Sequence, residues 1–393
     1  MNSEWKQYTL SQIGKIVTGK TPSTNDKSNY HGDIPFLTPS DDLTGKYVLK
    51  TQRKLSSKGV EKVKNCILPS NAICVSCIGS DLGKVVITTA STVTNQQFNS
   101  IIVDTESFDV DFVYYALVLL GQKLNYLSKT STAVPIVNKT MFSQQTISCP
   151  DLKTQQVIGR VLSALDNKIQ TNNLLNDNLE EQIELYYQYL FVINTKSEWK
   201  KGTISDLGDV IGGGTPSKAR PEYYTENGIG WITPKDLATT KAKFISHGEN
   251  DISELGLKNS SATIMPKGTI LFSSRAPIGY IAIASGEVTT NQGFKSVVPH
   301  PEIGTAYVYS FIKHNIPVIE GLGSGTTFKE VSGGTMRNVP AIIPDEGTLR
   351  KFTNFCTPLL NQQYVISEEN RKMSSLREYL LPMLMSGQIS IGD

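Results

Sequence analysis

The stretch IGRVLSALDNKIQTNNLLNDNLEEQIELYYQYL, residues 158–190, predicts a single long helix between two copies of one domain. Its apolar residues recur at alternating three- and four-residue spacing, which is typical of a helix that packs along a second helix. Roughly 33 residues at about 1.5 Å per residue give a rod on the order of 50 Å long. We call the apolar stripe the seam; it consists of Ile158, Leu162, Leu165, Ile169, Leu179, Ile183, Tyr186 and Leu190.

Two asparagines, Asn172 and Asn176, occupy seam positions where apolar residues are expected. Buried amides at such positions usually fix the register or the choice of partner helix, at some cost in stability. The alternative is a turn or a hydrated patch in an ordinary core helix. The sequence leaves both interpretations open.

A second amphipathic helix is expected to begin near Gly347 and to end at Pro382. Gln362 and Glu369 are the polar positions of its stripe. Two such helices with a compact domain between them can pack as an antiparallel coiled coil, because the domain returns the chain. The apolar members of this half of the seam are Phe352, Phe355, Leu359, Ile366, Met373, Leu376 and Leu380.

The segments that precede the two predicted helices are copies of one another. Matched motifs recur in one order, at offsets from 194 (213 − 19) to 197 (266 − 69) residues, so chance is a poor explanation. The matched pairs include Glu4-Trp5-Lys6 with Glu198-Trp199-Lys200, Thr21-Pro22-Ser23 with Thr215-Pro216-Ser217, Asp42-Leu43 with Asp236-Leu237, and Thr94-Asn95-Gln96 with Thr290-Asn291-Gln292.

Each copy predicts a mixed domain of short strands with a helix near its end. β-branched runs such as Val85–Thr89 and Tyr280–Ala284 alternate with Gly, Pro, Asn and Ser. The helical stretches are expected around Val110–Leu120 and Thr305–Lys313. The predicted fold is therefore α+β: mixed domains at 1–150 and 196–345, helical regions at 151–195 and 346–393, and a pseudo-two-fold arrangement.

Composition excludes several classes of protein. The net charge is only +2, so any basic surface must be local. No segment is long and apolar enough for a membrane span, and the N-terminus lacks the apolar core of a signal peptide, so a soluble cytoplasmic protein is expected. The pair Cys74-Val75-Ser76-Cys77 has no second pair with which to form a zinc site, and we expect buried strand cysteines.

The doubled layout suits a ligand with approximate two-fold symmetry, and duplex DNA is such a ligand. Dimeric DNA-binding proteins place their two recognition elements roughly 34–36 Å apart, a distance that the predicted rod can span. The stretch Lys46–Lys64 contains seven lysines and arginines and one acid, Glu61, which suits phosphate contacts. A solvated surface face remains the alternative.

Residues identical in both copies cannot distinguish two different half-sites, so they are expected to build the scaffold; these are Thr21/Thr215, Pro22/Pro216, Asn95/Asn291 and Gln96/Gln292. Stretches that differ are better candidates for base contacts, namely Lys46–Lys64 against Lys241–Lys258 and Thr130–Lys139 against Ser324–Lys329. The candidate DNA-binding residues are Lys20, Lys46, Lys50, Arg53, Lys54, Lys58, Lys129, Lys139, Lys218, Arg220, Lys241, Lys243, Lys258, Arg275 and Lys329.

No motif predicts catalysis or a bound cofactor or metal. The glycines at 321, 323 and 325 resemble a phosphate loop, but no helix opening follows them and the first copy has no such glycines. The four histidines have no matched partners. Asp42 and Asp236 each precede a leucine in a probable turn and are expected to cap backbone N–H groups.

The ordered motifs together resemble the specificity subunit of type I restriction–modification systems. The resemblance covers essentially the whole chain, including the closing Leu380-Leu381-Pro382-Met383-Leu384-Met385-Ser386-Gly387-Gln388-Ile389. It implies two target-recognition domains, each recognising half of a bipartite double-stranded DNA site, and helices that set the gap. The unequal basic content of the two copies leaves the contact residues open.

The resemblance also implies partners. Two modification subunits would dock on the helices and methylate adenine with S-adenosylmethionine, and restriction subunits would use ATP with Mg to translocate and cut. This chain would be non-enzymatic and hold no cofactor. One alternative is a coiled-coil adaptor for proteins, which would lack salt-dependent DNA affinity. The other is a methyltransferase or nuclease, in which case the purified chain by itself would methylate or cut DNA.

Overall fold

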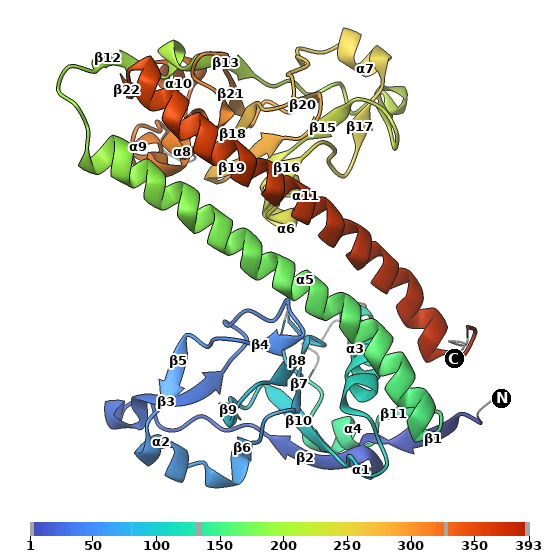
Figure 1. The fold of residues 1–393 in the computed structure, drawn as a ribbon. Helices are drawn as coiled ribbons and strands as arrows, with labels where there is room; N and C mark the ends of the chain where they lie inside the picture. The colour runs from blue at the N-terminus through green and yellow to red at the C-terminus, as the bar shows by residue number, and fades with distance from the viewer. Residues whose placement is uncertain (1–3, 80, 130–135, 326–328, 390–393) are drawn as a thin grey trace. The chain divides into compact units, whose positions relative to one another are not determined.

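The computed structural model describes residues 4–79, 81–129, 136–325 and 329–389. Contacts between residues divide the chain into two compact units. Unit 1 comprises Met1–Asn173 and Glu369–Asp393, and unit 2 comprises Leu174–Glu368. Each unit therefore contains one copy of the repeat and a part of both long helices, which Figure 1 shows in green (α5) and red (α11).

Unit 1 is built on a five-stranded sheet in the order β2-β10-β7-β8-β4, in which only the pair β4 and β8 is parallel. These strands are β2 (Gly14–Thr18), β10 (Phe98–Val103), β7 (Ile73–Ser76), β8 (Val85–Thr88) and β4 (Tyr47–Val48). A second sheet has the order β5-β3-β9-β6, with β5 (Arg53–Leu55), β3 (Tyr30–Leu37), β9 (Thr92–Thr94) and β6 (Ile67–Leu68). Strands β1 (Lys6–Thr9) and β11 (Thr146–Cys149) pair antiparallel.

Unit 2 repeats this order in a five-stranded sheet, β13-β21-β18-β19-β16, again with a parallel pair, β16 and β19, at one edge. The strands are β13 (Gly208–Gly212), β21 (Lys295–Pro299), β18 (Ile270–Ser274), β19 (Ile278–Ala284) and β16 (Phe244–Ile245). Smaller pairs join β12 (Lys200–Thr203) to β22 (Pro340–Ile343), β14 (Tyr224–Thr225) to β17 (Asp251–Ile252), and β15 (Gly230–Ile232) to β20 (Val288–Thr290). The predicted duplication of a mixed α/β domain is confirmed.

The helix after the sheet differs between the copies. In unit 1 it is continuous as α3 (Val110–Lys129), whereas in unit 2 it divides into α8 (Thr305–His314) and α9 (Ile316–Gly321). Pro317 lies in the first turn of α9, where a proline is tolerated, and its missing N–H explains the break. The short helices are α1 (Leu10–Ile13), η1 (Lys27–Asn29), α2 (Ser57–Glu61), η2 (Lys64–Cys66) and α4 (Lys139–Ser143) in unit 1, and η4 (Ile204–Asp206), η5 (Pro221–Tyr223), α6 (Pro234–Thr240), α7 (Glu254–Lys258) and α10 (Gly333–Arg337) in unit 2.

The predicted long helices are α5 (Leu152–Tyr187), continued by the π-helical turn η3 (Gln188–Ile193), and α11 (Glu346–Met385). They are antiparallel within each unit, because the residue numbers of the contacting residues on α11 decrease as those on α5 increase. In unit 1, Asp166 and Asn172 of α5 bond to Arg377 and Glu369. In unit 2, Glu180 bonds to Gln363, and Tyr186 stacks on Phe352 at 5.8 Å between ring centroids.

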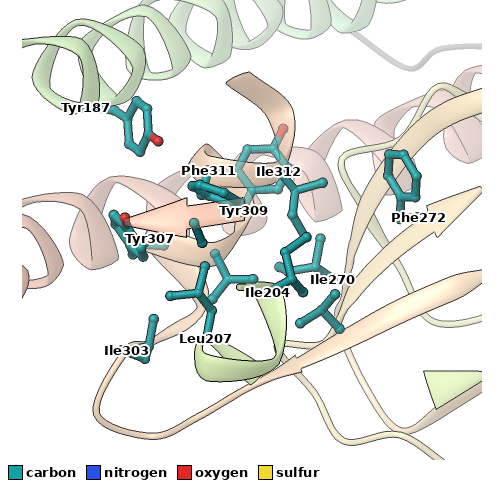
Figure 2. Packing of buried hydrophobic residues seen from close by; sticks show 14 of the residues in the cluster. Tyr187, Ile204, Leu207, Ile270, Phe272, Ile303, Tyr307, Tyr309, Phe311 and Ile312 are labelled. Atoms are coloured by element: carbon teal, nitrogen blue, oxygen red, sulfur yellow. The ribbon is translucent and has the colours of Figure 1, made fainter. Parts of the chain in front are cut away.

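Each part of α5 contributes to the core of its own unit. Ile158 and Leu162 are buried with α3 in unit 1, and Ile183 and Tyr187 are buried with α8 in unit 2. Figure 2 shows Tyr187 beside Tyr307 of α8; their ring centroids lie 6.1 Å apart. Burial of the apolar stripe by the domain and by α11 together explains why so long a helix is stable.

The α5 half of the predicted seam lies on the buried side of the helix. Ile158, Leu162, Leu179 and Ile183 are buried, and the other members, Leu165, Ile169, Tyr186 and Leu190, are partly buried. The helix continues without a turn through the two asparagines, and Asn172 is 3% exposed.

The α11 half of the seam is wrong in part. Phe352 and Ile366 are buried and Leu359, Met373 and Leu380 are partly buried. Phe355 is 43% exposed but contacts α5, with its ring centroid 4.6 Å from that of Tyr186, whereas Leu376 is 46% exposed. Over residues 352–366 the buried face includes Cys356, Leu360 and Gln363, each one position beyond Phe355, Leu359 and Gln362. Cys356 and Leu360 are buried in the core of unit 2, and a pattern of apolar residues alone cannot assign Gln363 to a buried position.

Pro382 does not end α11, which continues to Met385. Leu381, Leu384 and Met385 are buried in the core of unit 1, and this packing holds the last turn even though the proline removes one backbone donor. The cysteines at 74 and 77 are free and buried, as predicted, and burial raises the pKa of Cys74 to about 12. Among the described residues no helix is long and apolar enough to span a membrane.

Candidate nucleic-acid interface

The residues shared by the two copies bond to one another within each unit. Thr21 Oγ1 donates to Gln96 Oε1 at 2.6 Å, and Thr215 makes the same bond to Gln292 in unit 2. The Tyr30 hydroxyl donates to the Pro22 carbonyl at 2.8 Å, and Tyr224 bonds to Pro216 at 2.7 Å. These bonds agree with the scaffold role predicted for the shared motif.

The repeated aspartates cap backbone groups, but the residue that matches Asp236 is Asp41 and not Asp42. The Thr38 N–H donates to Asp41 Oδ2 at 2.7 Å, and the Thr233 N–H donates to Asp236 Oδ2 at the same distance. Asp42 accepts instead from the Thr44 N–H at 3.0 Å. The sequence pairs Asp42 with Asp236 at an offset of 194 residues (236 − 42), whereas the bonds pair Asp41 with Asp236 at an offset of 195 (236 − 41). The motif cannot distinguish them, because positions 41 and 42 are both aspartate.

A serine and a glycine build a matching turn in each unit. Ser56 Oγ accepts from the Gly59 N–H at the start of α2, and Ser253 Oγ accepts from the Gly256 N–H at the start of α7. A Cβ on Gly59 would lie 2.1 Å from the Asn29 carbonyl oxygen, so only glycine fits this close approach. The turn ties the helix to the loop before β3 in unit 1 and to η5 in unit 2.

Three exposed cations of unit 1, Arg53, Lys54 and Lys58, lie on or next to this turn, and a fourth, Lys20, lies beside β9. Arg53 and Lys54 lie on β5, the edge strand of its sheet, and the Arg53 guanidinium lies 5.3 Å from the centre of the Phe36 ring. Lys58 on α2 pairs with Asp26 at 3.1 Å, and its ammonium also contacts Ser28 Oγ. Lys20 bonds through its backbone N–H to the Thr94 carbonyl. Lys50, Lys129 and Lys139 are also exposed.

The equivalent turn of unit 2 carries more acid. Arg220 lies 3.5 Å from Glu222, and Lys258 lies 3.9 Å from Glu254. Arg275 is 38% exposed by side chain and lies 3.5 Å from Glu330. Lys218, Lys241 and Lys329 are exposed, and no acidic partner is found for them among the described residues. Of the stretches predicted to contact bases, residues 130–135 and 326–328 lie outside the described residues.

Lys46 is not a surface cation, so we remove it from the candidate interface. Its side chain is 2% exposed; Nζ lies 2.6 Å from Asp111 Oδ1 of α3 and donates to Ser163 Oγ of α5 at 2.6 Å. The ammonium also lies 5.1 Å from the centre of the Tyr115 ring. It therefore attaches the domain to its helix and cannot reach a phosphate.

Lys243 occupies the equivalent position before β16, and we remove it for the same reason. Its side chain is 17% exposed, pairs with Glu180 of α5, and donates to Gln363 Oε1 of α11 at 2.7 Å. Lys313 of α8 also pairs with Glu180, at 2.6 Å. Burial would raise the pKa of Glu180, but the two lysines outweigh it and lower that pKa to about 2.

Unit 1 has a second attachment that sequence reasoning missed. Asp166 of α5 accepts from the Tyr115 hydroxyl at 2.5 Å and from Arg377 of α11 at 2.6 Å. Burial, followed by the Asp166 charge, raises the pKa of Tyr115 well above its usual range. The only available signal was the spacing: Asp166 and Glu180 are two heptads apart (180 − 166 = 14), as are Gln363 and Arg377 (377 − 363 = 14).

Two of the four histidines contact carboxylates. His247 Nδ1 bonds to Asp251 beside β14, and His300 lies 3.8 Å from Asp209, each without a nucleophile in the same set of contacts. Gly321 ends α9, and Ser324 bonds to Glu330 across a short turn. The described residues hold no group of three or more side chains arranged to bind a metal ion.

Comparison with known proteins adds an independent finding. A family model described as "Type I restriction modification DNA specificity domain" matches residues 2–181 and again residues 196–364. The type I restriction enzyme MjaIX specificity subunit of Methanocaldococcus jannaschii is 43% identical over 149 residues, which are 37% of this chain and only 34% of that protein. The type I restriction enzyme HindI specificity subunit of Haemophilus influenzae is 21% identical over an alignment that covers 98% of this chain and all of that protein.

A solved structure shares the fold. The crystal structure of a type-I restriction-modification system S subunit from M. genitalium aligns with a TM-score of 0.64 at 17% identity, over 98% of this chain and 96% of that chain. The two family matches fall on the two copies of the repeat. This chain therefore belongs to the type I restriction–modification DNA specificity family, and it carries the specificity domain twice.

Proposed function

We propose that this chain is the specificity subunit of a type I restriction–modification complex, in which each copy recognises one half of a bipartite double-stranded DNA site. The observation that carries the proposal is the agreement between the two family matches and the two sheets of identical strand order. A shared scaffold with unlike exposed side chains is the arrangement that two different half-sites require.

In unit 1 the exposed cations Arg53, Lys54 and Lys58 support a phosphate-contacting surface on β5 and α2. In unit 2 the corresponding surface carries acids beside its cations, so we propose that its phosphate contacts come from Lys218, Lys241 and Lys329 instead. Phosphate contacts position such a domain on DNA, and side chains in the grooves provide the sequence specificity.

The long helices are the proposed docking surface for two modification subunits. Large apolar side chains are exposed on them: Leu185 at 57% and Tyr189 at 57% in unit 2, and Leu376 at 46% and Tyr379 at 64% in unit 1. Exposed apolar side chains on a helix that is already packed on its other face are typical of a protein-binding surface. Restriction subunits would join the assembled complex.

The chemistry would belong to the partners. Modification subunits would bind S-adenosylmethionine and methylate adenine, and restriction subunits would use ATP and Mg; this chain would contribute recognition only. We place the complex in the cytoplasm, where its DNA substrate lies.

The test is methyl transfer in vitro by purified modification subunits, with this chain and without it. We expect adenine methylation of a bipartite site only when the chain is present, no methylation by the chain alone, and DNA affinity that falls steeply as salt rises. Methylation by the chain alone would establish an enzyme, and DNA affinity independent of salt would leave the protein adaptor as the better account.

A further inference from the structure

The amide nitrogen of the buried Asn172 side chain donates to two residues of α11. Asn172 is 3% exposed, and its Nδ2 donates to Glu369 Oε2 at 2.8 Å and to Asn370 Oδ1 at 2.8 Å. Asn370 in turn donates to Asn173 Oδ1 at 2.8 Å. Lys168 lies 3.3 Å from Glu369 and neutralises part of its charge. All of these contacts lie within unit 1.

Asn172 and Asn176 interrupt a seam that is apolar before and after them. Leu162 and Leu179 are 0% and 4% exposed, and a leucine at position 172 would continue their stripe. A buried amide is less favourable than leucine in an apolar seam, and it is tolerated where its partners lie opposite in one register only. Asn172 therefore makes the seam less stable than leucine would, and its contacts form in one register only.

The two units report the same register independently. On antiparallel helices in one register, the residue numbers of facing partners add to the same total. Asp166 faces Arg377 in unit 1 and Glu180 faces Gln363 in unit 2, and both pairs of numbers add to 543. A slip of α11 by one heptad, about 10 Å along the axis, would remove Asn172 from both of its partners. It would also separate both of the other pairs, so no neighbouring register satisfies the buried polar groups.

We propose that Asn172 is a positioning residue that fixes the register of α5 against α11, and with it the gap between the two half-sites. The inference rests on the proposed function, because the gap is read from methylated DNA. Asn172 acts in this beside the Asp166–Arg377 and Glu180–Gln363 pairs, which have the same register.

The test is Asn172→Leu in the full chain, assembled with its modification subunits, with methylated adenines mapped across a genome. We expect the half-sites to stay unchanged, and methylated sites whose gap differs by about 3 base pairs (one heptad of ~10 Å at 3.4 Å per base pair) to rise at least tenfold over background. The midpoint of thermal unfolding should not fall, because leucine packs better than the amide it replaces.

Two control variants separate register from general stability. Asn172→Gln keeps an amide and should restore most of the wild-type gap. Leu179→Ala removes apolar packing from the seam and should lower the unfolding midpoint while leaving one gap. If Asn172→Leu does not assemble, Asn370→Leu removes the partner from α11 and is read in the same way.

A single unchanged gap in Asn172→Leu, or an equal spread of gaps in Leu179→Ala, would overturn the inference. A wild-type complex that methylates no bipartite site would overturn the proposed function itself. The wild-type and variant maps therefore distinguish the two failures.

Discussion

The two copies of the specificity domain are alike where they are bonded internally and unlike where they face solvent. Thr21 and Thr215 make the same bond, and Ser56 and Ser253 cap the same short helix, yet Lys58 of that helix in unit 1 corresponds to Leu255 in unit 2. The difference teaches that the fold tolerates changes of charge on this surface, as a family that must recognise many sequences requires.

The attachments to the helices differ in a second way. Each copy places a buried lysine, Lys46 or Lys243, before an edge strand, but the partners differ. Lys46 pairs with Asp111 of α3 and bonds to Ser163 of α5, whereas Lys243 pairs with Glu180 of α5 and bonds to Gln363 of α11.

The largest expected effect is the loss of the Glu180 attachment. Glu180→Ala leaves Lys243 and Lys313 without their carboxylate and should cost about 3 kcal/mol, because removing one partner of a buried pair strands the other charges. Asp166→Ala in unit 1 should cost roughly half as much, since it strands one cation, Arg377, which still has Glu378 at 3.9 Å.

Urea unfolding measures both losses, and hydrogen exchange should localise the first to α8 and the second to α3. Equal losses, or exchange that rises everywhere, would contradict the difference between the attachments. Glu180→Gln is the matched variant that retains the shape of the side chain.

The next effect concerns DNA. Replacing Arg53, Lys54 and Lys58 with Ala should lower the slope of log affinity against log salt by about three, and lower the affinity at moderate salt by roughly 2 kcal/mol. The same change at Lys218, Arg220 and Lys258 should have a smaller effect, because two of these cations have an acidic neighbour, whereas in the first set only Lys58 has one. Binding titrations of the assembled complex at several salt concentrations measure both, with Lys200→Ala as the control. Unchanged affinity at low salt in the first variant would remove this surface from the interface.

A smaller loss of stability is expected when the pH is lowered and Glu180 becomes protonated. The pKa of Glu180 is lowered from 4.5 to about 2 in the folded chain, so its contribution to stability is complete above pH 4.5 and is lost as the pH falls toward 2. The wild type should lose on the order of 1 to 2 kcal/mol more than Glu180→Gln over this interval. The measurement is the difference between their unfolding free energies at pH 5 and pH 3, and parallel curves for the two proteins would show that the ion pair does not act as described.

Much of the architecture was predictable because it repeats or because it is periodic. Matched motifs gave the two domains, and the Leu and Ile spacing gave the buried face of α5. The face of α11 was less predictable, because Gln363 is buried by its bonds to Lys243 and Glu180, which come from distant parts of the chain.

The candidate interface was predictable only as a region. Within the lysine-rich stretch of the first copy, nothing local distinguishes the buried Lys46 from the exposed Lys54, since the partners of Lys46 are 65 and 117 residues away. Charge density in a sequence predicts a basic segment, whereas tertiary contacts decide which of its side chains are free to bind.

The smallest effect tests the shared scaffold. Ser56→Ala and Ser253→Ala each remove the cap of a short helix and should cost about 1 kcal/mol. Because the two turns have the same bonds, the two losses should agree closely when measured by thermal unfolding of the full chain. A loss confined to one of the two variants would show that the scaffolds are less alike than their bonds indicate.

The most direct measurement of the central claim is a genome-wide map of methylated adenines in cells that express this chain with its modification subunits. Two unlike half-sites separated by one fixed gap are the predicted result. An undivided motif, or a map that does not change when the chain is removed, would contradict recognition of a divided site by two copies of one domain.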